Sequence, residues 1–157
     1  MPKSLKDLVA DAKTRIREIS ASDTAAAAKQ DPRLLIVDVR EPAEWAEGHI
    51  PGAMLVPRGM LEAKADLEYA NREPRLADRQ QAIVLHCASG GRSAFAADVL
   101  QAMGFTNVRS MAGGIAAWKE KACRSRSDGH CPSCITAAPA STAGARPKSS
   151  ARGSREI

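Results

Sequence analysis

One stretch of the chain combines the residue types that nucleophilic chemistry needs. Residues 83–86, Ile-Val-Leu-His, begin as a short apolar run that is typical of a strand buried on both faces. Cys87 follows this run directly, and a turn of small residues comes next. A cysteine in this place is a candidate nucleophile. The residues expected to surround its sulfur are Ala88, Ser89, Gly90, Gly91 and Arg92.

The sequence after the turn predicts a helix over 93–103, because apolar residues recur there at helical spacing and Gly104 stands where a helix should stop. The N–H groups of 88–91 are free to turn inward and could all point at the Cys87 sulfur, as in an anion-binding nest. Arg92 adds a fixed positive charge, and the helix dipole adds to it. We therefore expect the pKa of Cys87 to lie below the ordinary thiol range.

A structural role for Cys87 is the alternative, since free cysteines are usually buried and inert. That role gives no reason for a Gly-Gly turn and an arginine directly after the cysteine. The interpretation of Cys87 as a nucleophile is therefore favoured.

The elements that must position this cysteine alternate between strands and helices. Apolar patterning predicts strands near 16–19 and over 34–39, 54–56, 83–86 and 107–110. It predicts helices over 4–14, 23–30, 93–103 and 115–121, with shorter ones beginning at Pro42 and Pro57. Such alternation indicates an α/β fold with a mainly parallel central sheet and helices on both faces. The Cys87 loop then lies at the carboxyl end of its strand, where such sheets bind ligands.

Three motifs in this order resemble the signatures of the rhodanese family of sulfurtransferases. The pattern Cys-x-x-x-x-Arg-Ser over 87–93 resembles the active-site loop of a single-domain rhodanese. Residues 38–53, with Asp-Val-Arg-Glu-Pro and Gly-His-Ile-Pro-Gly-Ala, resemble the first signature, and 113–118, Gly-Gly-Ile-Ala-Ala-Trp, resemble the closing one. The resemblance implies a rhodanese-like domain over 15–122, preceded by an N-terminal helix within 1–14.

The resemblance also implies a reaction. Cys87 would take a sulfane sulfur from a small-molecule donor such as thiosulfate and hold it as a persulfide. A thiophilic acceptor, cyanide or a thiol (a protein thiol included), would then receive the sulfur. No cofactor and no metal would be needed. In such a site Asp38 and Arg40 would form the floor, Arg58 would border the pocket mouth, and His49 would be structural.

These supporting residues have simpler interpretations as well. Asp38 stands in an apolar strand and needs a partner, and Arg40, two residues on, shares its face. A structural ion pair between them is at least as well supported as a role in the site. Arg58 could equally be a solvated surface arginine.

Two other functional classes remain open. Cysteine-based phosphatases also use a loop from Cys to Arg, but with five residues between the two, whereas four separate Cys87 from Arg92. A shorter ring suits a sulfur atom better than a phosphate group. A non-catalytic rhodanese-like module for binding or redox sensing is the second alternative.

Composition and charge limit the partners and the compartment that can be expected for this protein. The net charge is +5, but much of the excess comes from 123–157, so nucleic acid is not a favoured partner. Charged residues interrupt the N-terminus, and no apolar run approaches the roughly 20 residues that span a bilayer. We expect a cytoplasmic protein that does not bind membranes, with its cysteines reduced.

The last segment, 123–157, is a basic tail rich in Ser, Ala and Pro, and its composition predicts disorder. It contains Cys123, His130, Cys131 and Cys134. These could form a zinc site or a redox pair. His130 abuts Cys131 and leaves no spacer to wrap a metal, so an incidental cluster is favoured.

Overall fold

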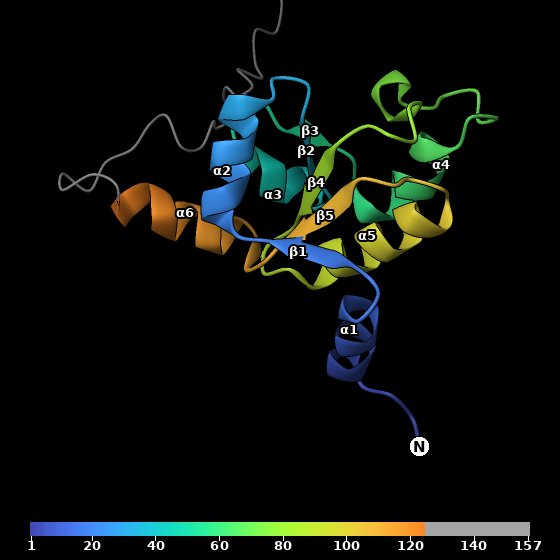
Figure 1. Cartoon of the computed structure of the whole chain (residues 1–157). Helices are drawn as coiled ribbons and strands as arrows, with labels where there is room; N and C mark the ends of the chain where they lie inside the picture. Colours follow the sequence, from blue (N-terminus) through green and yellow to red (C-terminus); the bar gives the residue numbers. More distant parts are fainter. Residues whose placement is uncertain (125–157) are drawn as a thin grey trace, which may run out of the picture.

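A computed structural model describes residues 1–124 of the chain (Figure 1). The strands are β1 (Arg17–Ile19), β2 (Leu35–Asp38), β3 (Met54–Leu55), β4 (Ile83–His86) and β5 (Val108–Met111). The helices are α1 (Leu5–Lys13), α2 (Ala21–Gln30), α3 (Pro42–Glu47), α4 (Leu61–Ala65), α5 (Gly91–Ala102) and α6 (Gly114–Arg124), with 3-10 turns η1 (Arg58–Met60) and η2 (Pro74–Leu76).

The five strands form one sheet in the order β1-β5-β4-β2-β3, and every neighbouring pair is parallel. β4 occupies the centre, where Leu85 lies between Val37 of β2 and Ser110 of β5. All four residues of β4 are buried, as its three apolar residues predict, and His86 is buried with them. The expected α/β fold with a parallel sheet is confirmed, and Cys87 leaves the sheet at the carboxyl end of its central strand.

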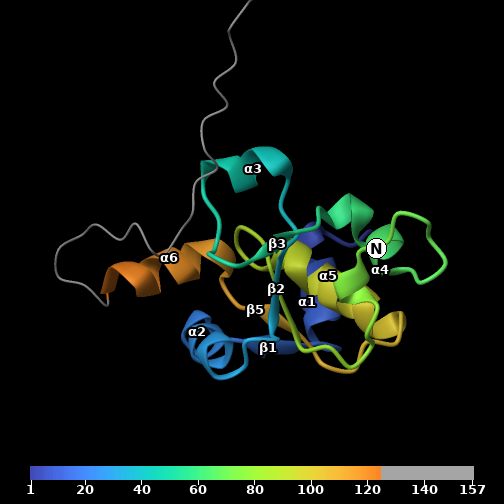
Figure 2. The ribbon, with the colours of Figure 1, turned by 90° about the horizontal axis from the view of Figure 1, so that it is seen from above.

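Helices cover both faces of the sheet (Figures 1 and 2). On one face α4 and α5 pack over Leu85 and Val37, and the alanines of α5 let this helix approach the strands closely. On the other face α2 and α6 pack over Val84 and Ile36. Residues alternate between the faces along each strand, so Cys87 falls on the α5 side and His86 on the opposite side.

Local signals fix several helix ends. The Ser4 hydroxyl and the Asp7 carboxylate form a reciprocal capping box on α1. Ser20 caps α2, which therefore begins at Ala21 rather than at residue 23. At the other end of the domain α6 runs to Arg124, beyond the expected end at residue 121, because the good helix formers that follow Trp118 contain no stop signal.

The polar composition of 63–81 predicts a helix end and a long surface connection, but the structure anchors this segment to the core. Leu76 in η2 is only 1% exposed and belongs to the core on the α5 side. The Arg79 guanidinium donates to the carbonyls of Ala65 and Leu76 and lies 4.3 Å from the centre of the Phe105 ring. Leu67 and Leu76 stand nine positions apart among many charged residues and give no periodic pattern, so the sequence did not reveal this anchor.

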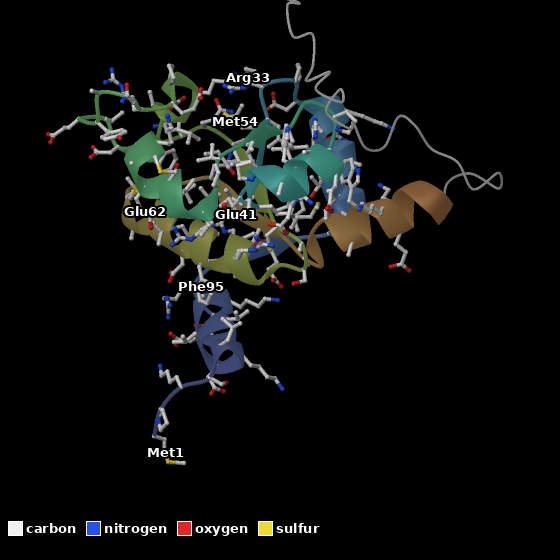
Figure 3. The ribbon with its side chains drawn as sticks, turned by 180° about the vertical axis from the view of Figure 1, so that it is seen from behind. Met1, Arg33, Glu41, Met54, Glu62 and Phe95 are labelled. Atoms are coloured by element: carbon white, nitrogen blue, oxygen red, sulfur yellow. The ribbon has the colours of Figure 1, made fainter. Side chains whose placement is uncertain are left out.

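Helix α1 lies against α5 close to the Cys87 loop. The Arg15 guanidinium donates to both carboxylate oxygens of Asp98 at 3.0 and 2.8 Å, and Ala12 is buried in the contact. Figure 3 shows Phe95 of α5 at the end of α1 nearest the domain, and Met1 at its far end. The N-terminal helix is thus joined to the helix that carries the loop.

Several sequence-based expectations fall on residues that the structure does not describe. The expected disorder of the tail concerns residues outside the described part of the chain, and so does the expected cluster of His130, Cys131 and Cys134. Cys123 lies within α6. Over residues 1–124, no helix is both long enough and apolar enough to cross a membrane.

Candidate active site

The Cys87 sulfur lies at the floor of a loop that joins β4 to α5, and Cys87 is only 1% exposed. Gly90 has a φ of +108°, in the left-handed region where a side chain would be strained. This conformation turns the Gly90 N–H back toward the sulfur, which accepts its hydrogen bond at 3.1 Å. Gly90 therefore provides one of the inward-pointing N–H donors that the sequence suggested.

Burial alone would raise the pKa of Cys87 by disfavouring the charged thiolate. Hydrogen bonds from the Ser93 backbone and hydroxyl, and from the N–H groups of Gly90 and Ser89, act in the opposite direction. Their combined effect is larger, and the pKa of Cys87 lies below its ordinary value. The expectation of an activated thiol therefore agrees with the local geometry.

A second serine, Ser110, contacts the Ser93 hydroxyl. The Ser110 hydroxyl on β5 donates to the Ser93 oxygen at 2.9 Å, and both residues are fully buried. The Ser93 hydrogen can then go to the Gly90 carbonyl at 3.2 Å or to the Cys87 sulfur at 3.6 Å. An anionic thiolate is the better acceptor of the two. Neither serine was among the site residues expected from the sequence; the available signal was a serine in an apolar strand, facing the same side as Cys87.

The Ser93→Ala variant is expected to raise the pKa of Cys87, because the thiolate loses one hydroxyl donor while the backbone donors stay. The rate of iodoacetamide labelling measured against pH gives this pKa. Ser89→Ala is the matched control, since it keeps the Ser89 N–H. Equal titration curves for Ser93→Ala and the unmodified protein would contradict the role of the hydroxyl.

Arg92 is engaged by a carboxylate. Its two terminal nitrogens each donate to one oxygen of Glu44, on α3, at 2.8 Å. The bonds to Arg92 hold the pKa of Glu44 at about 2, so this carboxylate is ionised throughout the neutral range. The sequence predicted a guanidinium whose charge closes the ring around the sulfur. The structure adds a partner for that charge, Glu44, which was not among the site residues expected from the sequence.

The Asp38–Arg40 pair lies on the opposite face from Cys87, at the same end of the sheet. The Arg40 guanidinium donates to Asp38 at 2.8 Å and to the Gly48 carbonyl at 2.9 Å, and both side chains are almost fully buried. The expected ion pair is confirmed, and it ties β2 to the link after α3. His86, whose pKa is lowered by burial, lies with its Nε2 3.7 Å from Asp38.

Arg58 and His49 lie at the same end of the sheet. The Arg58 N–H donates to the Val39 carbonyl, while its guanidinium is bound to both Glu62 oxygens at 2.8 and 2.9 Å. The charge of Arg58 is therefore paired with Glu62 of α4, and its place at a pocket mouth stays a prediction. The His49 Nδ1 lies 3.0 Å from the Trp45 carbonyl and its ring stacks on Trp45, in agreement with the structural role expected for it.

The second glycine turn holds the loop from the other side. The Ile115 N–H, in the first turn of α6, donates to the Cys87 carbonyl at 2.8 Å. Gly114 has a φ of +58°, and a Cβ atom there would lie 2.6 Å from the carbonyl carbon and oxygen of Ala88. The Gly-Gly turn is therefore needed for the close approach of α6 to the Cys87 loop.

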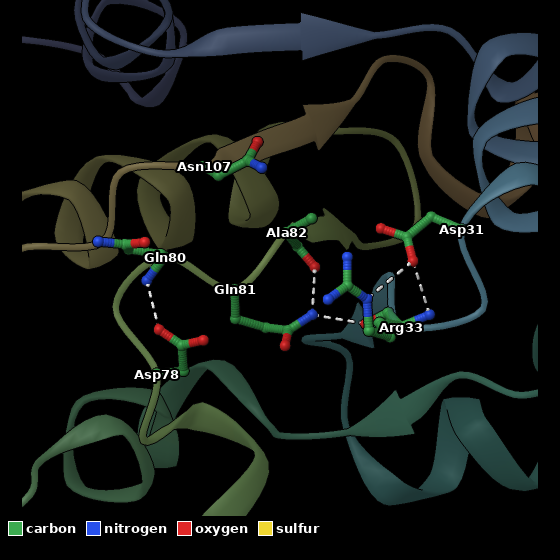
Figure 4. Close-up of a pocket in the computed structure, with 7 residues that line it drawn as sticks. All are labelled: Asp31, Arg33, Asp78, Gln80, Gln81, Ala82 and Asn107. Atoms are coloured by element: carbon green, nitrogen blue, oxygen red, sulfur yellow. Dashed lines mark hydrogen bonds and ion pairs between the residues drawn. The ribbon is translucent and has the colours of Figure 1, made fainter.

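A polar surface pocket of about 280 Å³ lies away from this loop (Figure 4). Its lining comes from segments that precede β2, β4 and β5, at the amino end of the sheet: Asp31, Arg33, Asp78, Gln80, Gln81, Ala82 and Asn107. The Gln81 amide closes one side by donating to the Arg33 and Ala82 carbonyls. Because Cys87 is at the carboxyl end, this pocket is separate from the candidate active site.

Comparisons with known proteins cover the same region. The family model of the rhodanese-like domain matches residues 21–121. A human thiosulfate:glutathione sulfurtransferase is 33% identical over 96 residues, which are 57% of this chain and 82% of that protein. A probable adenylyltransferase/sulfurtransferase MoeZ of Mycobacterium tuberculosis is 33% identical over 89 residues, and this chain spans only 21% of its length.

Among solved structures, a Rhodopseudomonas palustris protein of unknown function, described as a possible tyrosine phosphatase, superposes with a TM-score of 0.70. It is 33% identical, and the match covers 77% of this chain and 96% of that one. The sequence motifs, the parallel sheet and these matches agree, and the chain belongs to the family of rhodanese-like domains.

Proposed function

We propose that this chain is a sulfurtransferase and that Cys87 carries the transferred sulfur as a persulfide. The observation that carries the proposal is the set of donors around the buried Cys87 sulfur, which lowers its pKa despite burial. A thiolate is the reactive form of cysteine toward sulfur. The names of the relatives support the same chemistry, since two of them are described as sulfurtransferases.

The reaction has two displacement steps. The Cys87 thiolate attacks the sulfane sulfur of a donor such as thiosulfate, the donor S–S bond breaks, and sulfite leaves with its electron pair. A thiol or cyanide then attacks the outer sulfur of the persulfide and regenerates the thiolate. The N–H donors of Ser89, Gly90 and Ser93 stabilise the anionic sulfur in both states. No step requires a cofactor or a metal.

The remaining loop and floor residues support this geometry. Ala88 and Gly91 add little or no side chain to the loop around the sulfur, and Arg92 lies close enough to Cys87 to act on it electrostatically. The Asp38–Arg40 pair fixes the end of β2 next to the end of β4. Small-molecule donors and thiol acceptors are the proposed partners, as the human thiosulfate:glutathione relative suggests.

A phosphatase is the second candidate, favoured by the description of the Rhodopseudomonas palustris neighbour. Four residues between Cys87 and Arg92 make a small ring, and each terminal nitrogen of Arg92 already donates one hydrogen bond to the Glu44 carboxylate. These two features favour sulfur transfer.

Parallel assays separate the candidates. Thiosulfate with cyanide is expected to yield thiocyanate, and p-nitrophenyl phosphate is expected to stay intact. Protein incubated with thiosulfate should gain the mass of one sulfur atom, which cyanide or dithiothreitol removes. Hydrolysis of the phosphate ester without sulfur loading would favour the phosphatase. Inactivity in both assays, with no loading from any sulfane donor, would favour a non-catalytic module.

A further inference from the structure

The charge of the loop arginine is offset by a fixed carboxylate. Arg92 and Glu44 are joined by two hydrogen bonds of 2.8 Å, and their side chains are 37% and 34% exposed. A paired guanidinium with this fork geometry is held in one orientation. An incoming anion therefore meets Arg92 together with the negative charge of Glu44, and not a free cation.

The other arginines near this edge of the sheet are paired in the same way. Arg40 is bound to Asp38 beneath the surface, and Arg58 is bound to Glu62. The loop residues 88–91 carry no charge, and Glu41 lies close enough to Arg92 to act on it electrostatically. The positive field at the sulfur thus comes from N–H dipoles and the amino end of α5, without an unpaired arginine among these three.

We propose that Glu44 sets the donor specificity of the site by disfavouring dianions such as thiosulfate. It thereby favours alkyl persulfides, in which the sulfane sulfur is bound to the sulfur atom of an organic thiol. This inference rests on the proposed sulfurtransferase function and narrows its substrate class. The repulsion between Glu44 and a donor grows with the donor's charge, so a dianion loses more than a monoanion. The N–H dipoles around Cys87 stabilise one anionic sulfur, so they offset only part of the repulsion between Glu44 and a dianion.

The favoured first step balances without another reactant. The Cys87 thiolate attacks the outer sulfur of R–S–SH, a bond forms between Sγ and that sulfur, and the original S–S bond breaks. The leaving group is the thiolate R–S⁻, and the proton stays on the transferred sulfur or passes to the leaving thiolate. Sulfane sulfur moves from one thiol to another, and no oxidant is consumed.

Substitution of Glu44 by Gln tests the proposal, since it removes the charge and keeps the shape. Loading of Cys87 is followed by intact mass with thiosulfate and, separately, with cysteine persulfide as donors. In Glu44→Gln the rate constant for thiosulfate is expected to rise about tenfold and that for cysteine persulfide to change less than about twofold. Glu47→Gln, which removes an exposed charge from the same helix, should change neither rate.

A salt series on the unmodified protein gives an independent measurement. Raising the ionic strength screens Glu44, so loading by thiosulfate should accelerate relative to loading by cysteine persulfide. An unchanged donor ratio in Glu44→Gln, or an equal fall for both donors, would overturn the specificity role while the loading itself upholds the sulfurtransferase. Failure of the unmodified protein to accept sulfur from either donor would instead refute the proposed function, and the specificity role with it.

Discussion

Replacement of Cys87 by Ser is expected to abolish sulfur transfer, by more than about 10³-fold, while the fold is retained. The serine hydroxyl stays protonated at neutral pH and cannot carry a persulfide. The change is small, and the Gly90 N–H and the Ser93 hydroxyl that contact the sulfur remain as partners for an oxygen. Thiocyanate formation and intact mass after thiosulfate treatment measure the loss, and the melting temperature reports the fold.

Cys123→Ser is the matched control, because it removes a thiol from the same chain outside the loop. This variant should load sulfur at the rate of the unmodified protein. Retained activity in Cys87→Ser, or a sulfur adduct on Cys123, Cys131 or Cys134, would contradict the assignment of Cys87 as the nucleophile.

Gly114→Ala is expected to lower both stability and activity strongly. Its Cβ would collide with the Cys87 carbonyl and with the carbonyl group of Ala88, which are backbone atoms and cannot rotate away. Either α6 or the Cys87 loop must move, and the hydrogen bond from Ile115 to the Cys87 carbonyl is then strained. We expect a loss of about 2 to 4 kcal/mol in the free energy of unfolding, or a melting temperature lower by ~10 °C or more.

A variant at a second glycine, Gly104, distinguishes the effect of this collision from the effect of backbone strain. Gly104 also has a left-handed φ, +94°, but no atom lies within 4 Å of a Cβ placed there. Gly104→Ala should therefore cost only the strain, about 1 to 2 kcal/mol, and leave sulfur loading unchanged. Equal losses of stability and of loading in the two variants would show that close packing of α6 on the loop has no special role.

Local features of the sequence determined the fold class and the place of the chemistry. The apolar run before Cys87 identified the central strand, because a strand buried on both faces tolerates little else. Ser4 with Asp7 marked the start of α1, since a cap depends on residues three positions apart. Cys87, Gly90 and Arg92 could be placed in one loop because they are adjacent along the chain, and adjacency needs no knowledge of packing.

Only the tertiary structure decided which residues from distant segments contact these groups. Glu44 pairs with Arg92 over 48 positions of sequence, and Ser110 reaches Ser93 over 17. Such contacts follow from the parallel register of the strands and from how α3 and α5 pack, which no local pattern encodes. The sequence therefore placed Cys87, two glycines and Arg92 together after the central strand and predicted a reactive thiol there. The packing of distant segments determined how much positive charge that loop can offer to a donor, because a charge acts according to its distance in space.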